Sequence, residues 1–195
     1  ISLGGDGAIA LPEMRALSRH HADLVTVHID AHTDAYPMDG HNTATSFTRA
    51  VEERLIDPRR SFQIGMRGFN MMPGVRTHAL ALGYNVVSLQ DLLETGIDRV
   101  FAGVRRKIGR RPVYLCFDLD FFDPSVAPGV CSPCFGGATA REGFAVLDAC
   151  AGLDIVGVSV NTLCPPHDPT GVTALQAATV TLDCLRLVAA RTRRC

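Results

Sequence analysis

Two short acidic segments carry the side chains of this sequence that are best suited to chemistry. The first places Asp30, His32 and Asp34 at alternate positions of H-I-D-A-H-T-D, and the second places Asp118 and Asp120 in C-F-D-L-D. Alternate residues of an extended chain point in the same direction, so each segment can present its polar side chains to one point. If the two segments meet, they bring four carboxylates and one imidazole together.

Such a cluster of carboxylates needs a positive partner. Two unit charges about 4 Å apart interact by roughly 4 kcal/mol at an effective dielectric constant near 20. Two divalent ions would neutralise four carboxylates, and two ions roughly 3.5–4 Å apart can activate a bridging hydroxide. Carboxylates with one imidazole suit Mn²⁺ best, and Ni²⁺, Co²⁺ and Zn²⁺ are also compatible. The alternative is that the aspartates only hold turns after strands, which explains one such pair better than it explains two.

The elements that must position these side chains follow an alternating pattern. Short apolar or β-branched segments predict buried strands, and segments of helical period lie between them. After a strand end at 1–4, the expected strands are 24–29, 62–66, 85–88, 113–117 and 155–160, and the expected helices are 12–20, 46–55, 75–82, 97–108, 140–150 and 175–191. Strands that are apolar on both faces predict an α/β fold, in which helices cover a mainly parallel sheet on both sides.

Polar segments follow four of the expected strands. In open α/β sheets, ligands bind outside the carboxyl ends of the strands. The two aspartate segments, the G-G-D-G run at 4–7 and the loop 161–168 each come directly after a strand. We therefore expect all four segments at one edge of the sheet.

The composition is that of a globular protein. The length of 195 residues suits one domain, 1–195, with a sizeable core. The 19 basic and 20 acidic residues are interspersed, so no basic face for nucleic acid is expected. We find no apolar run of the roughly 18 residues that cross a membrane and no signal peptide, so the protein is expected in the cytoplasm.

The seven cysteines are odd in number, and several lie in apolar runs. This usage indicates reduced thiols that pack as small hydrophobic groups. Cys131 and Cys134 have C-x-x-C spacing, but a zinc site usually needs a second pair, and a redox motif opens a helix. No metal or redox role is therefore expected for them. His28 lies inside an apolar strand and is expected to be a core histidine.

Several longer motifs are distributed along essentially the whole chain. They are L-G-G-D (3–6), D-A-H-T-D (30–34), F-T-R-A-V-E-E (47–53), L-I-D-P (55–58), Q-I-G-M-R-G (63–68), D-L-D-F-F-D-P-S-V-A-P-G (118–129), G-G (136–137) and D-P-T-G-V-T-A-L-Q-A-A (168–178). With these motifs the sequence resembles the ureohydrolases, the family of arginase, agmatinase and guanidinobutyrase. The wording D-A-H-T-D-A-Y and Q-I-G-M-R-G is most similar to the agmatinase branch.

The resemblance implies a three-layer α/β/α fold of the arginase type and hydrolysis of a guanidino C–N bond with release of urea. It implies up to two divalent ions, Mn²⁺ or Ni²⁺, bound by Asp30, His32, Asp34, Asp118 and Asp120. The implied substrate is a small cationic guanidine compound such as agmatine. The resemblance also implies a homo- or hetero-oligomer, a trimer or hexamer, and a family N-terminal segment that this chain lacks.

Three positions depart from the family pattern. The first family motif reads G-G-D-H, with a metal-binding histidine where this chain has Gly7, so one metal position is expected to be weakened. Thr162 replaces the glutamate that binds the guanidinium, and it cannot form a bidentate charge-assisted pair. The proton-shuttling histidine of the H-G-T motif corresponds to Thr43, with His41 two residues earlier. His41 is the candidate catalytic residue, and Thr162 and His167 are the candidates for substrate contact.

Two functions follow from this pattern. The first is a ureohydrolase whose activity is impaired in this chain. The second is a catalytically inactive structural or regulatory subunit that pairs with an active paralogue in a hetero-oligomeric guanidine hydrolase. A metal-dependent deacetylase is disfavoured, because that class uses a single zinc and a histidine dyad, and the pair His20-His21 lies on the wrong side of its strand.

Overall fold

Six parallel strands form one sheet in the computed structural model, which describes residues 1–68 and 71–192. The strand order is β1-β6-β5-β2-β3-β4, with bounds Ser2–Leu3 (β1), Val25–Ile29 (β2), Phe62–Met66 (β3), Asn85–Ser88 (β4), Pro112–Asp118 (β5) and Asp154–Asn161 (β6). Every pair of neighbours runs parallel, and β1 pairs Ser2 with Ser159 of β6. The central strands β2 and β5 are buried at every residue, as the apolar character of their sequences predicts.

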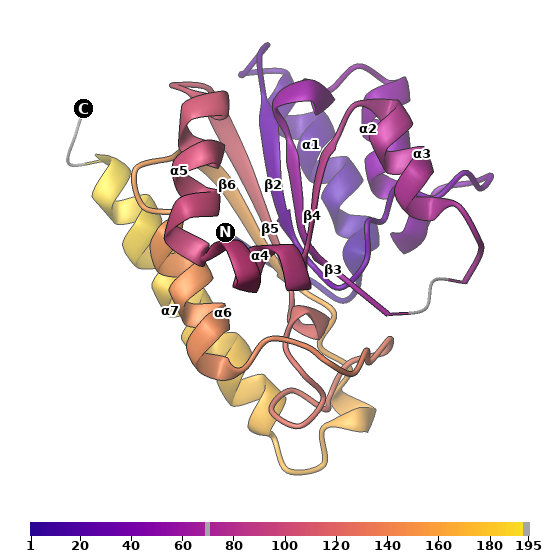
Figure 1. The fold of residues 1–195 in the computed structure, drawn as a ribbon, viewed down its shortest axis with the longest axis vertical. Helices are drawn as coiled ribbons and strands as arrows, with labels where there is room; N and C mark the ends of the chain where they lie inside the picture. The colour runs from indigo at the N-terminus through magenta and orange to yellow at the C-terminus, as the bar shows by residue number, and fades with distance from the viewer. Residues whose placement is uncertain (69–70, 193–195) are drawn as a thin grey trace.

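Seven helices of the described residues cover the two faces of this sheet (Figure 1). One face carries α1 (Ala10–Ser18), α2 (Ser46–Glu52) and α3 (Val75–Leu82). The other face carries α4 (Leu89–Thr95), α5 (Ile97–Ile108), α6 (Ala140–Ala149) and α7 (Val172–Thr192). The expected three-layer α/β/α fold is confirmed.

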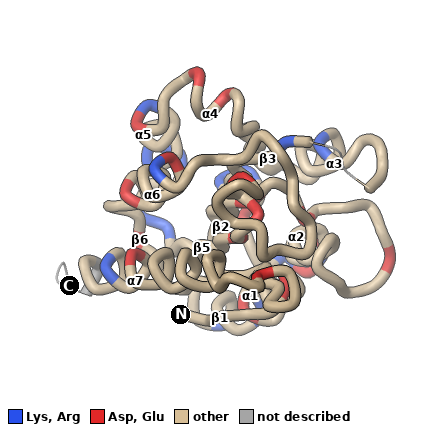
Figure 2. Tube along the Cα trace, turned by 90° about the horizontal axis from the view of Figure 1, so that it is seen from below, with Lys and Arg blue, Asp and Glu red and all other residues tan. Residues whose placement is uncertain are grey.

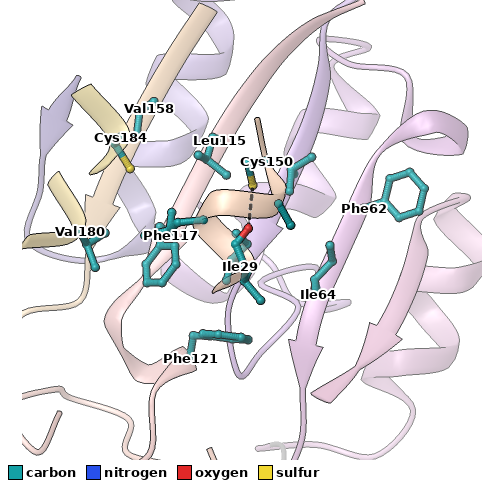
Figure 3. Packing of buried hydrophobic residues seen from close by; sticks show 14 of the residues in the cluster. Ile29, Phe62, Ile64, Leu115, Phe117, Phe121, Cys150, Val158, Val180 and Cys184 are labelled. Atoms are coloured by element: carbon teal, nitrogen blue, oxygen red, sulfur yellow. Dashed lines mark hydrogen bonds between the residues drawn. The ribbon is translucent and has the colours of Figure 1, made fainter. Parts of the chain in front are cut away.

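The larger hydrophobic core lies between the sheet and helices α4 to α7. Alternate residues of the central strands face it, among them Ile29, Leu115 and Phe117, and they pack with side chains such as Val180 of α7 (Figure 3). Cys150 at the end of α6 is buried in this core, and its thiol donates to the carbonyl of Val146 at 3.4 Å. Burial raises the pKa of the Cys150 thiol, so it behaves as a small hydrophobic group, as expected.

Helix α4 was not expected from the sequence. It begins directly after β4, with Ser88 as both the last strand residue and the N-cap, whose hydroxyl accepts from the backbone N–H of Asp91 at 3.0 Å. Gly96, at φ 92°, then separates α4 from α5. A strand that passes into a seven-residue helix without a loop leaves no turn residues to reveal the boundary.

Helix α7 is the one helix of the described residues that by length and composition could cross a membrane. The stretch Val172–Ala190 has a mean hydropathy of 1.3, and 28% of it is buried. Helices that cover a sheet can have the same length and apolar composition, and α7 packs against β6 and α6. Asp183 and Arg186 interrupt its apolar sequence, so the composition of α7 is a weak indication of a membrane segment.

Candidate metal centre

The five predicted ligands lie together at the carboxyl edge of the sheet. Asp30 directly follows β2, and Asp118 is the last residue of β5. Because Ile29 pairs with Phe117 in the sheet, the two carboxylates start from adjacent positions. Asp120 follows in a 3-10 turn. Figure 2 views this edge of the sheet and shows acidic residues gathered beside the end of β2.

These side chains line a cavity of about 620 Å³. All four polar segments that were expected at one sheet edge contribute to its walls, together with the loop 131–135. The lining residues are Gly5, Asp6, Asp30, His32, Asp34, Tyr36, Thr43, Ala44, Gly68, Met71, Asp118, Asp120, Cys131, Ser132, Pro133, Cys134, Phe135 and Thr162. The carboxyl ends of parallel strands thus converge on one hollow, as they do in other open α/β sheets.

Asp30 is shared between two groups of potential ligand atoms. In the first group, Nδ1 of His32 lies 3.4 Å from Oδ1 of Asp30 and 3.3 Å from Oδ2 of Asp120. In the second group, Asp30, Asp34, Asp118 and His28 each offer one atom, and these atoms lie within 4.8 Å of one another. Metal–ligand bonds of about 2.0–2.2 Å fit either group. The arrangement is suited to two ions joined by one carboxylate.

The turn after β2 is held by its own polar groups. The backbone N–H of His32 donates to Oδ1 of Asp30 at 2.9 Å. Asp34 has a left-handed backbone with φ 46°, a conformation that aspartate tolerates better than most residues. Its carbonyl accepts from the N–H of Phe47 at the start of α2 at 2.9 Å. This connection holds the backbone of Asp34 at the start of α2.

Burial and mutual repulsion shift the acidity of these carboxyl groups. Burial, and next the charge of Asp30, raise the pKa of Asp34, Asp118 and Asp120. Burial also acts to raise the pKa of Asp30, but its interactions with His28 and His32 outweigh that effect and lower it. Interactions with Asp120 and Asp30 outweigh burial at His32 and raise its pKa to about 12. A site with this much buried acidity is suited to cations.

The donor set fits divalent metal ions. Oδ1 of Asp120 is buried and has no hydrogen-bond partner among the described residues. A buried carboxylate oxygen without a partner is costly, and a bound cation would satisfy it. Carboxylate oxygens with an imidazole nitrogen are ligands that Mn²⁺ and Ni²⁺ accept.

Gly7 lies against the second group of ligand atoms. It begins the 3-10 turn Gly7–Ile9, and a Cβ atom there would lie 2.5 Å from Oδ2 of Asp34 and 3.5 Å from Oδ2 of Asp118. A side chain at this position would therefore point into the cluster. The hydroxyl of Thr43, 2.7 Å from the same Cβ position, donates to Oδ2 of Asp34 at 3.4 Å. Thr43 and Asp34 thus close the space beside the glycine.

Thr162 lines the cavity, but its hydroxyl serves the backbone. Oγ1 accepts from the N–H of Leu119 at 2.8 Å and donates to the carbonyl of Asn161 at 2.7 Å. The residue also has a left-handed backbone with φ 70°. Its side chain therefore holds the turn between β5 and Asp120 in place.

His41 and His167 are not among the residues that line the cavity. The side chain of His41 is 62% exposed, and its Nε2 lies 4.0 Å from Oε1 of Glu53. Nδ1 of the exposed His167 lies 3.0 Å from the carbonyl of Val130. These positions give no support to the catalytic role expected for His41 or to the substrate contact expected for His167.

Two residues that sequence reasoning missed support the site. Nη2 of Arg67 donates to the carbonyls of Asp120 at 2.7 Å and Cys134 at 2.8 Å, and so ties two cavity walls to the end of β3. Nδ2 of Asn161 donates to Oδ1 of Asp118 at 3.2 Å. Arg67 directly follows β3, and Asn161 is the last residue of β6. Both lie at the carboxyl ends of strands, and that position is the sequence signal by which they could have been found.

Comparison with known proteins identifies the family. The profile of the Arginase family matches residues 1–186. A guanidinopropionase from Pseudomonas aeruginosa is 38% identical over 193 residues, which make up 97% of this chain and 60% of that protein. An agmatinase from Neisseria gonorrhoeae is 38% identical over 192 residues, 98% of this chain and 60% of that protein.

A solved structure shows the same relationship. The proclavaminate amidino hydrolase from Streptomyces clavuligerus superposes with a TM-score of 0.92 and 34% identity, over 97% of this chain and 64% of that one. The chain spans about three fifths of the length of the curated relatives it matches. Its sequence, its fold and the positions of its acidic motifs agree, and this chain belongs to the arginase family.

Proposed function

We propose that this chain binds two divalent metal ions and serves the hydrolysis of a guanidino C–N bond. The observation that carries the proposal is the position of Asp30, which two compact groups of ligand atoms share. Asp34, Asp118 and His28 belong to one group, and His32 and Asp120 belong to the other. Bound ions would supply Lewis acidity and an activated water. Mn²⁺ is the first candidate metal and Ni²⁺ the second.

The charge of the cavity supports a cationic substrate. Its lining includes Asp6 as well as the four aspartates of the cluster, and no Lys or Arg is among the lining residues of the described chain. A volume of about 620 Å³ suits a small molecule. The relatives named above are a guanidinopropionase, an agmatinase and an amidino hydrolase. We therefore propose a small guanidine compound as the substrate, with urea as a product.

A second candidate function is favoured by Thr162. Its hydroxyl is engaged by Leu119 and Asn161, so the side chain offers no charged group to a guanidinium. The chain would then be an inactive subunit that pairs with an active paralogue in a hetero-oligomer, a trimer or hexamer. In either role we propose a cytoplasmic protein, since all six cysteines of the described residues are unpaired.

Metal content and urea release together separate these functions. The purified chain would be dialysed against Mn²⁺ or Ni²⁺, its metal measured by mass spectrometry, and urea assayed with agmatine, guanidinopropionate and guanidinobutyrate. Two ions with urea release are expected for the hydrolase, and two ions without urea release for the inactive subunit. An Asp30→Ala variant should lose both ions. A wild-type chain that binds no ion would overturn the proposal.

A further inference from the structure

We propose that His28 provides the nitrogen ligand of the ion held by Asp30, Asp34 and Asp118. The inference rests on the proposed metal binding and concerns how one of its two positions is completed. Gly7, which lies against this group of atoms, has no side chain to offer as a ligand. His28 was expected to be a core histidine, and its surroundings indicate a more specific role.

The position of His28 directs its ring at the carboxylate cluster. It lies in β2, two residues before Asp30, and it is completely buried. The ring stacks on Phe47 of α2, with centroids 4.1 Å apart and an interplanar angle of 20°, which fixes the plane of the imidazole. Nε2 lies 3.1 Å from Oδ2 of Asp30 and 3.8 Å from Oδ1 of Asp118.

Neither ring nitrogen of His28 makes an aligned hydrogen bond to any described residue. A core histidine is normally satisfied by such bonds, because each buried polar group without a partner costs about 1–3 kcal/mol. Here Nε2 is close to two carboxylates without being aligned with either of them. A cation located between the nitrogen and the carboxylates would satisfy all three groups at once.

The spacing of the four groups fits one ion. The ligand atoms of His28, Asp30, Asp34 and Asp118 lie within 4.8 Å of one another. Ligands bound at about 2.0–2.2 Å from one ion lie roughly 3–4.3 Å apart, in the range of the distances from Nε2 to Asp30 and Asp118. The resulting set of carboxylates and one imidazole resembles the set that Asp30, His32 and Asp120 form.

The side of the cluster next to Gly7 is closed. A Cβ atom at Gly7 would meet Asp34 at 2.5 Å and the hydroxyl of Thr43 at 2.7 Å. The carboxylate and the hydroxyl therefore occupy the direction from which a side chain at residue 7 would approach. His28 instead reaches the cluster from β2, on the sheet side, with Nε2 near Asp30 and Asp118.

Pulsed electron paramagnetic resonance on Mn²⁺-loaded protein tests the assignment, because it detects nitrogen bound directly to the ion. A His32→Gln variant removes the imidazole of the other group, so any histidine nitrogen still bound comes from His28. With less than one equivalent of Mn²⁺, we expect nitrogen coupling in His32→Gln and its loss in His32→Gln/His28→Gln. Labelling with ¹⁵N-histidine identifies the signal.

The number of bound ions gives a second measurement. At Mn²⁺ concentrations that saturate the wild type, His28→Gln should retain one ion where the wild type binds two. Glutamine keeps an N–H within reach of Asp30. If His28 only positions this carboxylate, the His28→Gln variant should therefore retain both ions. His78→Gln is the matched control, since His78 lies on α3 outside the cavity and its Nε2 is also buried without a partner.

Each outcome decides a different claim. If His32→Gln binds Mn²⁺ without histidine nitrogen, or if both His28→Gln and His28→Leu, which has no ligand atom, retain two ions, His28 is not a ligand while the metal site stands. If the wild type binds no ion, the proposed function itself fails. Should His28→Gln not fold, as judged by circular dichroism in EDTA, the nitrogen coupling of His32→Gln decides alone.

Discussion

A Cβ atom at Gly7 would lie 2.5 Å from Oδ2 of Asp34, closer than van der Waals contact allows. The absence of a side chain at residue 7 is therefore part of how the carboxylate cluster packs. Asp34 and Thr43 use the space, and the hydroxyl of Thr43 donates to Asp34. Introducing a side chain there requires both residues to move.

Replacing Gly7 by alanine should destabilise the metal-free protein. The added methyl group overpacks the cluster, and overpacking costs about 1–3 kcal/mol of the free energy of unfolding. Gly5→Ala is the control, because a Cβ at Gly5 meets nothing within 4 Å; we expect a change of less than about 0.5 kcal/mol. Denaturant unfolding in EDTA measures both. Equal stabilities would show that Asp34 and Thr43 move aside freely.

Gly65 should be still less tolerant of a side chain. It lies at the irregularity in β3 with φ 112°, and a Cβ there would lie 2.4 Å from Phe121 and 2.7 Å from the carbonyl oxygen of Asp30. Backbone strain and overpacking together should cost about 2–5 kcal/mol in Gly65→Ala. Gly103→Ala, in an open position of α5, should instead gain about 0.5–1 kcal/mol. Thermal and denaturant unfolding measure the stability of both variants. Equal stabilities would contradict this expectation.

Asp34→Asn should stabilise the metal-free protein and weaken its response to metal. Burial, followed by the charge of Asp30, raises the pKa of Asp34 above its value in the unfolded chain, so the ionised group costs stability as the pH rises. Asparagine removes this cost and tolerates the left-handed backbone. We expect a higher Tm in EDTA and a smaller rise of Tm on adding Mn²⁺. Asp23 is exposed, and Asp23→Asn is the control that should change neither the Tm in EDTA nor its rise with Mn²⁺. An unchanged response to Mn²⁺ in Asp34→Asn would exclude Asp34 as a ligand.

Thr162→Val should destabilise the turn that leads to Asp120. It removes the acceptor for the buried N–H of Leu119, and an unsatisfied buried donor costs about 1–3 kcal/mol. Thr179 on the exposed side of α7 gives the control, since its hydroxyl only donates to the carbonyl of Leu175. Thr179→Val should change stability by less than about 0.5 kcal/mol. If denaturant unfolding gave the same loss for both, the hydroxyl of Thr162 would have no structural role.

Asp123 should give the fold a pH-dependent contribution in the acid range. Hydrogen bonds from Ser125 first, and then from the N–H of Gly137, lower the pKa of Asp123 to about 2. Because this value lies below that of the unfolded chain, the contribution is present above about pH 4 and is lost as the pH falls toward 2. The stability difference between wild type and Asp123→Asn should therefore shrink from pH 5 to pH 2 in denaturant titrations, and a constant difference would contradict it.

The fold followed from the sequence because its strands are apolar on both faces. The expected strand 62–66 matches β3 at both ends, and helix 97–108 matches α5. Helix α4 was missed because Ser88 ends a strand and caps a helix at once. Local patterns reveal elements most clearly where turn residues separate them.

The candidate site was predicted in part. The sequence indicated the five candidate ligands because they lie at alternate positions at strand ends, where the fold fixes their direction. His41 lies in a loop and His167 ends a short 3-10 turn, and no periodicity indicates which way such side chains point. The sequence predicts a core residue at His28, because the pattern of an apolar strand is the same whether its histidine faces a hydrophobic core or a carboxylate cluster. Only the three-dimensional distances to Asp30 and Asp118 distinguish the two.

The pairing of β1 with β6 has a consequence for the order of folding. Ser2 of β1 pairs with Ser159 of β6. The strand β1, which leads into the 4–7 segment, is therefore held by the last strand of the chain. Closing so long a loop is costly in entropy and slow. During synthesis the cavity cannot be complete until β6 has been made and docked. The proposed metal uptake should therefore be a late event, and a variant truncated before β6 should not retain the proposed ions.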